Sequence, residues 1–222
     1  MVTEDHRWLP ADFWTGNTDA NVITAVPRPR VLDWTEWSDS EWRRQVRAEV
    51  MAMAPGWPCS ATDVLRTPLT LPNAWWHDLR HGLEVIRSTT TSRHGVTAEQ
   101  VKTRVHAVFD VDLPVNRWET VHGDLHWSNL LMPDFGLLDW ELWGSGPAGY
   151  DEATLYLFSL LIPDTARRVN EVFRDVLDSP DGRQAQVFVA ARILSRAQQG
   201  ENSDLAQVVR EHIQPIVDTA AL

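Results

Sequence analysis

The stretch from His122 to Glu141 gathers the side chains of this sequence that are best suited to chemistry. Its apolar pairs, Leu130-Leu131 and Leu137-Leu138, alternate with polar residues, and short connections between buried strands can hold a fixed site. The residues of the stretch that could do chemistry include His122, Asp124, His126, Asn129, Asp139 and Glu141. Carboxylate and amide oxygens are hard ligands, so this set suits Mg²⁺ better than zinc.

Two carboxylates and one asparagine are the minimum set for phosphoryl transfer. One carboxylate orients the attacking hydroxyl group and accepts its proton, while the asparagine and the second carboxylate hold the metal ion that neutralises the phosphates. The residue types in this stretch therefore indicate phosphoryl transfer.

A second interpretation starts from the alternation of His122, Asp124 and His126. On a strand these side chains would share a face and could bind a transition metal. A metallohydrolase would need a further cluster of ligands downstream, but the only later histidine is His212. We therefore expect His122 to be a buried histidine that fixes the loop by hydrogen bonding. The role of His126 is open between loop packing and substrate contact.

The order His-Gly-Asp-Leu-His-x-x-Asn at residues 122–129, followed by Leu-Asp-Trp-Glu at residues 138–141, resembles the catalytic loop and metal-binding segment of the aminoglycoside phosphotransferase and choline kinase family. That family is similar in its logic to the protein kinases. The resemblance implies a protein-kinase-like α+β fold that uses ATP and Mg²⁺. The resemblance rests on specific motifs over residues 122–151 and extends as a looser similarity over roughly residues 20–165.

The resemblance also implies roles for single residues. Asp124 would be the catalytic base, and Asn129 and Asp139 would be the Mg²⁺ ligands. Glu141 would lie near the metal as a further candidate ligand. Asp151, in Gly149-Tyr150-Asp151, would brace the backbone of the catalytic loop from the next helix.

A fainter resemblance extends toward the N-terminus. Residues 26–32 are similar to the segment before the fourth strand of the family's small lobe, and residues 50–56 to its fifth strand and hinge. The adenine ring would pair with the backbone at that hinge. Met51 and Met53 are therefore candidate nucleotide-binding residues.

The N-terminal residues depart from the family's pattern. The family's small lobe begins with a glycine-rich turn and a lysine that contacts the ATP phosphates, but the 25 residues before Val26 contain one glycine, Gly16, and no lysine. The only lysine, Lys102, lies far downstream. Arg7 could be a remnant of the third strand. Either the chain starts late relative to its relatives, or arginines hold the phosphates, or a protein partner completes the lobe. We expect weak nucleotide binding by this chain alone.

The hydrophobic pattern predicts a small strand-containing lobe followed by a larger helical lobe. The resemblance implies that the first is a reduced N-terminal lobe over residues 1–55 that ends at a hinge, and the second a C-terminal lobe over residues 56–222. The first would contain a helix near residues 17–26 and a hairpin over residues 30–54, followed by a linker near 54–60. The second would contain short strands over residues 118–140 and helices beginning near residue 71 and at 97–108, 151–162, 164–178, 182–199 and 203–220.

Composition excludes several classes of protein. The net charge of −11 disfavours nucleic-acid binding and slightly favours cationic small substrates. No stretch approaches the 18 apolar residues of a membrane span, and residues 1–7 lack the basic start of a signal peptide, so we expect a cytoplasmic protein with no membrane partner. Cys59 is the only cysteine, and we expect a half-buried, unreactive thiol. The twelve tryptophans should be mainly core residues.

The sequence thus predicts an ATP-dependent phosphotransferase that moves the γ-phosphoryl group to a small-molecule hydroxyl. The acceptor could be an aminoglycoside, another natural product, or a Ser or Thr side chain of a peptide. The alternative is a degenerate kinase fold that serves as a binding or scaffold protein without catalysis. The presence of Asp124, Asn129 and Asp139 together argues against that alternative. Acidic positions on the later helices are expected to be solvated, and they are Glu152, Asp164, Glu171, Asp175 and Glu201.

Overall fold

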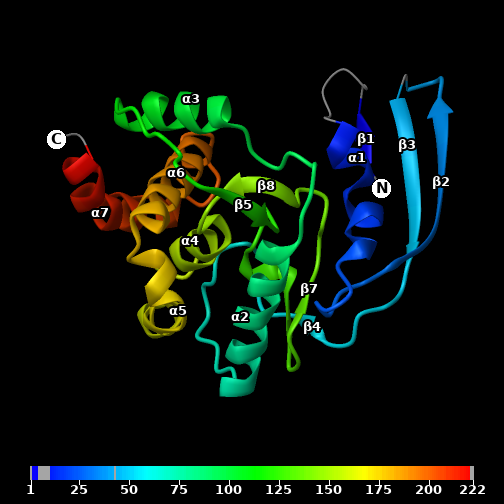
Figure 1. Ribbon diagram of the computed structural model, residues 1–222, viewed down its shortest axis with the longest axis horizontal. Helices are drawn as coiled ribbons and strands as arrows, with labels where there is room; N and C mark the ends of the chain where they lie inside the picture. Colours follow the sequence, from blue (N-terminus) through cyan, green and yellow to red (C-terminus); the bar gives the residue numbers. More distant parts are fainter. Residues whose placement is uncertain (1, 5–10, 43, 221–222) are drawn as a thin grey trace.

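The computed structural model of the protein describes residues 2–4, 11–42 and 44–220. A β-sheet and one helix lie at one side of the molecule, and a group of helices lies at the other, with short strands between them (Figure 1). This arrangement confirms the predicted α+β class. The predicted strand remnant at Arg7 falls outside the described residues.

The N-terminal sheet is built on the predicted hairpin. Strands β2 (Val31–Asp39) and β3 (Arg44–Met51) pair antiparallel, with Trp37 opposite Val46. Strand β1 (Val2–Glu4) pairs with the other edge of β3, which gives the order β1-β3-β2. Asp39 closes the turn, because its carboxylate accepts hydrogen bonds from the Trp42 N–H and the Arg44 guanidinium.

The first helix does not lie where the sequence predicted it. Helix α1 spans Ala11–Asp19, a 3₁₀ turn follows at Ala20–Val22, and the chain is extended from Ile23. Arg28 explains the early end, since its guanidinium donates to the carbonyls of Ala20 and Ile23 and so replaces further helical hydrogen bonds. The apolar side chains of this segment, Ala20, Ile23 and Val26, are nevertheless buried.

Helices α2 (Asn73–Ser88) and α3 (Ala98–Phe109) agree with the predicted ranges. Helix α2 buries an apolar stripe that contains Leu79, Leu83 and Ile86. Helix α3 begins at a capping box in which Thr97 and Gln100 each accept the other's backbone N–H.

Short strands connect the two sides of the molecule. Strand β4 (Trp57–Pro58) pairs with β6 (Leu130–Met132), which also pairs with β7 (Gly136–Leu137). The predicted linker at 54–60 therefore contains a strand. Strand β5 (Trp118–Val121) pairs with β8 (Gly144–Pro147). A 3₁₀ turn at Trp127–Asn129 lies between β5 and β6.

The remaining chain forms helices α4 (Tyr150–Leu157), α5 (Pro163–Leu177), α6 (Pro180–Ala197) and α7 (Ser203–Ala220). Pro163 and Pro180 are each the first residue of a helix, where the missing N–H costs nothing. Helix α4 is shorter than predicted. Helix α6 packs against α3, α4 and α7.

One hydrophobic cluster links both sides of the molecule. Trp75, Trp76 and Trp127 pack ring against ring inside it, and Ala20 and Ile23 join it from the N-terminal side. Other tryptophans, including Trp34 and Trp42, are exposed on the N-terminal sheet, so the expectation of core tryptophans holds only in part. No helix among the described residues is long and apolar enough to cross a membrane.

Glu152 corrects a further expectation. The sequence placed it on a solvated face, but the residue is only 2% exposed. It forms an ion pair with Arg87 of α2, which also pairs with Glu119 of β5 at 3.2 Å. The pattern of α4 missed this because burial of a paired carboxylate depends on a partner 65 residues away.

Candidate active site

The catalytic loop at residues 122–129 is held by Asp151, the second residue of α4. The Asp151 carboxylate accepts the N–H of His122 at 2.6 Å and the N–H of Gly123 at 3.0 Å. Burial raises the pKa of Asp151 to about 7, against the opposing effect of these two hydrogen bonds. Gly123 has φ of +86°, and a Cβ there would lie 2.5 Å from the Leu142 carbonyl oxygen, so the sharp turn requires glycine. Asp151 therefore has the bracing position that the sequence predicted.

His122 joins this loop to the segment at residues 138–141. Its Nε2 lies 2.9 Å from the Leu138 carbonyl oxygen, and its Nδ1 lies 3.4 Å from the Asp124 N–H. These partners assign the proton to Nε2. Burial lowers the pKa of His122 to about 4, so the ring is neutral. With both ring nitrogens engaged, His122 is a structural residue, as predicted, and not a metal ligand.

Asp124 carries a fixed hydrogen-bond partner. His126 Nε2 lies 3.1 Å from Asp124 Oδ2, and the Ser128 hydroxyl lies 3.0 Å from His126 Nδ1. Burial alone would raise the pKa of Asp124, but the hydrogen bond and charge of His126, with the charge of Arg192, hold it below its usual value. His126 therefore orients a carboxylate that is ionised at neutral pH, and its other oxygen, Oδ1, is free to face a ligand.

Asn129 is buried, and its side chain lies beside Asp124. Its Nδ2 donates to the Asp124 carbonyl oxygen at 3.0 Å, and its own carbonyl oxygen accepts the Leu138 N–H at 2.8 Å. Within the described part of the chain, its side-chain Oδ1 accepts no hydrogen bond. This oxygen is a ready ligand for a cation next to Asp124 and the 138–141 segment.

Asp139 and Glu141 add two more carboxylates. Asp139 has φ of +59°, which is uncommon for a residue with a Cβ. The residue before it, Leu138, is held by hydrogen bonds to the His122 ring and the Asn129 carbonyl oxygen. Desolvation and the charge of Asp124 raise the pKa of Asp139, although its side chain still reaches solvent. Burial, Asp139 and Glu49 raise the pKa of Glu141 to about 7. The carboxylates repel one another, and a bound cation would relieve that repulsion.

A transition-metal site gains no support. Among residues 2–4, 11–42 and 44–220, no three His, Cys, Asp or Glu side chains form a group arranged to hold a metal ion. Asn129, whose side-chain oxygen accepts no hydrogen bond from the described residues, is not one of these types and so lies outside that set.

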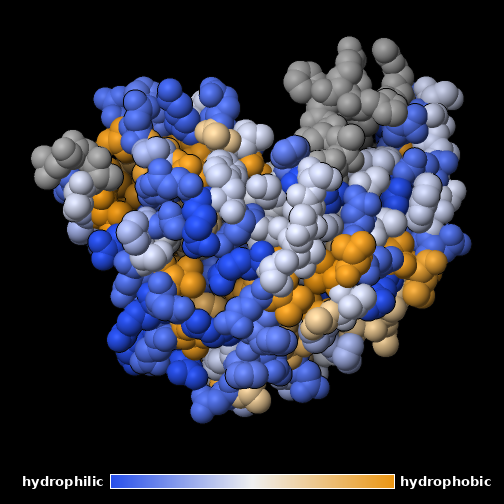
Figure 2. All heavy atoms as spheres, viewed as in Figure 1, coloured by the Kyte–Doolittle hydropathy of each residue, from blue (hydrophilic) through white to orange (hydrophobic). Residues whose placement is uncertain are grey.

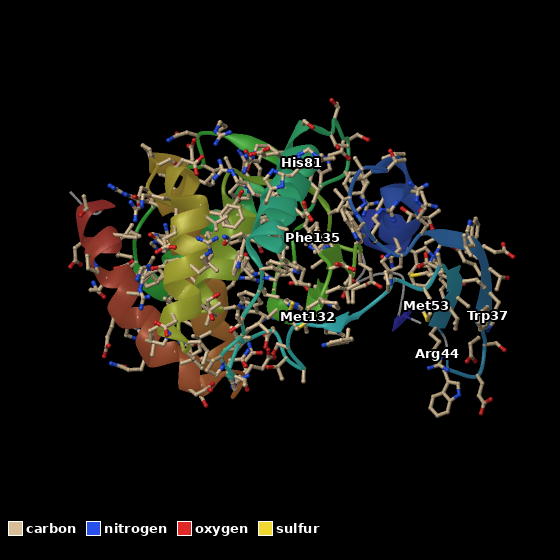
Figure 3. All side chains as sticks on the ribbon, turned by 90° about the horizontal axis from the view of Figure 1, so that it is seen from below. Trp37, Arg44, Met53, His81, Met132 and Phe135 are labelled. Atoms are coloured by element: carbon tan, nitrogen blue, oxygen red, sulfur yellow. The ribbon has the colours of Figure 1, made fainter. Side chains whose placement is uncertain are left out.

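Met51 and Met53 lie apart from this group, where β3 leads toward β4. Met51 is 38% exposed and Met53 is 94% exposed, and Figure 3 shows Met53 beside the N-terminal strands. The Ala52 N–H between them donates to the Arg30 carbonyl oxygen at 2.8 Å. Among the described residues, the N–H groups of Met53 and Ala54 have no such partner, so this backbone can pair with a ligand. The space-filling view shows apolar side chains gathered at the foot of the N-terminal sheet (Figure 2).

Two arginines near the N-terminal sheet already have partners. Arg47 pairs with Glu36 and Glu49 and donates to Thr18, and Arg28 binds carbonyl oxygens. These two guanidinium groups are therefore poor candidates for holding phosphates, whereas Arg30 is exposed. Lys102 is exposed on α3.

The structure adds residues that the sequence did not single out. A pocket opens beside Asp124, and its other lining residues are Phe158, Val189, Arg192, Ile193, Arg196 and Asn202. Most of them come from α6, where nothing in the periodicity separates Arg192 from the other arginines. Cys59, by contrast, is half-buried as predicted, and burial raises its pKa to about 12.

Comparisons with known proteins agree with this geometry. A family model described as "Phosphotransferase enzyme family" matches residues 61–188, more than half of the 222 residues. The comparison with curated proteins finds no match.

Three solved structures illustrate the shared fold. A thermostable mutant of aminoglycoside phosphotransferase APH(4)-Ia in its apo form has a TM-score of 0.65 at 17% identity, over 96% of this chain and 85% of that one. APH(3'')-Id from Streptomyces rimosus has a TM-score of 0.56 at 15% identity, over 82% of this chain and 79% of that one. A ternary complex of the APH(4)-Ia mutant contains ADP and hygromycin B, with a TM-score of 0.64 at 16% identity over 95% and 84% of the two chains. At these identities the likeness concerns the fold.

Proposed function

The chain belongs to the phosphotransferase enzyme family, and from this premise we propose that it transfers the γ-phosphoryl group of ATP to a hydroxyl group of a small molecule. The observation that carries the proposal is the meeting of Asp124, Asn129 and the 138–141 segment. Asn129 bonds to the Asp124 backbone at 3.0 Å and to the Leu138 N–H at 2.8 Å. A scaffold without catalysis would have no need for these three elements to converge.

Asp124 receives the acceptor in this proposal. Since His126 occupies Oδ2, the free Oδ1 accepts a hydrogen bond from the acceptor's hydroxyl group. The hydroxyl oxygen bonds to the γ-phosphorus while the bond from that phosphorus to the β–γ bridging oxygen breaks. ADP leaves, and the hydroxyl proton passes to Asp124. The lowered pKa makes Asp124 a weak base, so orientation of the hydroxyl is its larger contribution.

Asn129 Oδ1 and Asp139 would hold Mg²⁺, with Glu141 as a further ligand. Oxygen donors of this kind fit Mg²⁺, and burial, followed by the charge of neighbouring carboxylates, raises the pKa values of Asp139 and Glu141. Bound Mg²⁺ supplies positive charge that neutralises the phosphates. The backbone of residues 53–54, beside Met51 and Met53, would pair with the adenine ring.

The division into lobes stays part of this proposal. A boundary near residue 55 is supported by β4, which pairs with β6 of the C-terminal part only two residues later. Residues 20–26 nevertheless pack into the core of the larger part, so the N-terminal lobe is not an independent unit. A protein partner remains one proposed source of a phosphate-binding group, because Arg28 and Arg47 already have partners.

Calorimetric titration with Mg-ATP tests the metal assignment. We expect Asp139→Asn to weaken Mg-ATP binding at least about tenfold, because a charged ligand is lost, and to leave binding in EDTA unchanged. Asp134→Asn, an exposed aspartate in the adjacent turn, is the matched control and should bind as the wild type does. Equal affinity of wild type and Asp139→Asn for Mg-ATP would contradict the assignment.

A further inference from the structure

The pocket beside Asp124 has an unexpected charge. Its apolar walls are Phe158, Val189 and Ile193, and Asp124 is its only acidic lining residue. Two arginines, Arg192 and Arg196, also line it, so the pocket carries a net positive charge inside a protein with a net charge of −11.

Arg192 is half-buried, and its guanidinium still reaches solvent. It makes no ion pair and no hydrogen bond within the part of the chain that the structure describes. Its guanidinium carbon lies over the Tyr150 ring, 5.4 Å from the centroid. Burial lowers the pKa of Arg192 to about 10, while the charge of Asp124 acts in the opposite direction, so the side chain is positive at neutral pH. A half-buried guanidinium that makes no hydrogen bond to the protein has its N–H groups available, and an anionic ligand would pair with them.

The other polar residues of the pocket do not offset this charge. Asn202 is fixed, since its Nδ2 donates to Asp63 at 2.9 Å and its Oδ1 accepts from Arg66 at 2.8 Å. The Arg196 side chain is 51% exposed, and its Nε lies 3.9 Å from Glu201 Oε2. Arg196 therefore lies at the pocket's rim and forms only a long ion pair. Arg192 is therefore the one inner cation that faces the reacting carboxylate.

We propose that Arg192 binds an anionic group of the acceptor, with Arg196 at the rim, and thereby places the acceptor's hydroxyl at Asp124. This inference rests on the proposed function and specifies its acceptor as a hydroxy acid. A guanidinium holds a carboxylate through two parallel hydrogen bonds, which fixes both distance and direction. The same cation repels an aminoglycoside, which carries several positive charges, so the pocket selects against that class. The small preference for cationic substrates expected from net charge is reversed at the site.

The test compares acceptors that differ in charge. Gluconate, glycerate and shikimate are titrated by calorimetry beside uncharged glucose and glycerol and the cations glucosamine and kanamycin. We expect a hydroxy acid to bind most tightly. Arg192→Gln should weaken that acid about tenfold or more and change the uncharged compounds less than about twofold. Arg192→Lys should retain part of the affinity, and Arg183→Gln, on the exposed side of the same helix, should retain all of it.

The outcomes separate this inference from the proposed function. Each titration is run with and without Mg-ATP, and an unchanged Mg-ATP affinity of Arg192→Gln shows that the variant is folded. The inference is overturned if glucosamine, kanamycin or an uncharged compound binds more tightly than every acid, if no acid binds at 10 mM, or if Arg192→Gln leaves the acid affinity unchanged. Loss of Mg-ATP binding by the wild type, with the acid preference intact, would overturn the proposed function alone.

Discussion

Asp151 shows how one side chain can decide the geometry of the catalytic loop. It is buried, and its carboxylate is the acceptor for the N–H groups of both His122 and Gly123. We expect Asp151→Ala to lower the free energy of unfolding by about 3 kcal/mol, because two buried donors lose their partner. Urea denaturation measures the change. Asp164→Ala, at an exposed helix start, should cost less than about 1 kcal/mol, and a similar cost for both variants would refute the bracing role.

Glu141 links the site to pH. Its folded pKa of about 7 lies above the ordinary value of 4.5, so the folded protein binds more protons than the unfolded chain between these pH values. Stability therefore falls as pH rises through this window, and the loss is complete above pH 7. We expect Glu141→Gln to raise the free energy of unfolding by about 2 kcal/mol at pH 8, a value reduced for partial exposure, and to have little effect at pH 4.

Thermal or urea unfolding of Glu141→Gln at both pH values is the measurement. Asp134→Asn serves as the control for loss of one negative charge near the site. If Glu141→Gln is less stable than the wild type at pH 8, then ionised Glu141 does not destabilise the folded protein and the prediction is wrong.

At the level of elements, Arg87 joins α2 to β5 and α4. It pairs with Glu119 and Glu152, both of which are nearly buried. Arg87→Met should cost about 3 kcal/mol, because it leaves the buried Glu152 carboxylate without a cation, whereas Glu119 keeps its ion pair with Arg117. Adding Glu152→Gln should recover part of that stability. Differential scanning calorimetry of the single and double variants checks this, and a double variant less stable than Arg87→Met would count against the network.

Elements whose sequence patterns are local were predictable. The stripe of α2, the capping box of α3 and the hairpin over β2 and β3 each follow from neighbouring residues. The end of α1 was not predictable, because Arg28 sets it from outside the helix. The short strand β4 depends on pairing with β6, 75 residues later at Trp57↔Met132.

The candidate site divides in the same way. Asp124, Asn129 and Asp139 could be found from spacing and from a resemblance, since the motif is compact in sequence. Arg192 could not, because only the packing of α6 on α4 brings it to Asp124. The proposed substrate-binding residue Arg192 lies on a helix whose sequence pattern does not distinguish it from the other arginines.

At the scale of the whole molecule, one core spans both sides, and the site lies where its segments meet. The N-terminal segment contributes to that meeting, since Gly16 packs against the backbone of Trp140 and Glu141, and Asn17 accepts the Trp140 N–H. A Cβ at position 16 would lie 2.5 Å from the Glu141 carbonyl oxygen. We expect Gly16→Val to displace the 138–141 segment and weaken Mg-ATP binding at least about tenfold. Calorimetry measures the Mg-ATP affinity. An unchanged affinity would show that α1 does not position the 138–141 segment for binding.

Transfer of the γ-phosphoryl group itself tests the central claim most directly. Wild type, Asp124→Asn and Asp134→Asn are incubated with Mg-ATP carrying ³²P at the γ position and with the hydroxy acids, and labelled product is counted. The account predicts labelled product from the wild type and from Asp134→Asn, and a loss of at least about 100-fold in rate for Asp124→Asn. Labelled product formed by Asp124→Asn at the wild-type rate would contradict it.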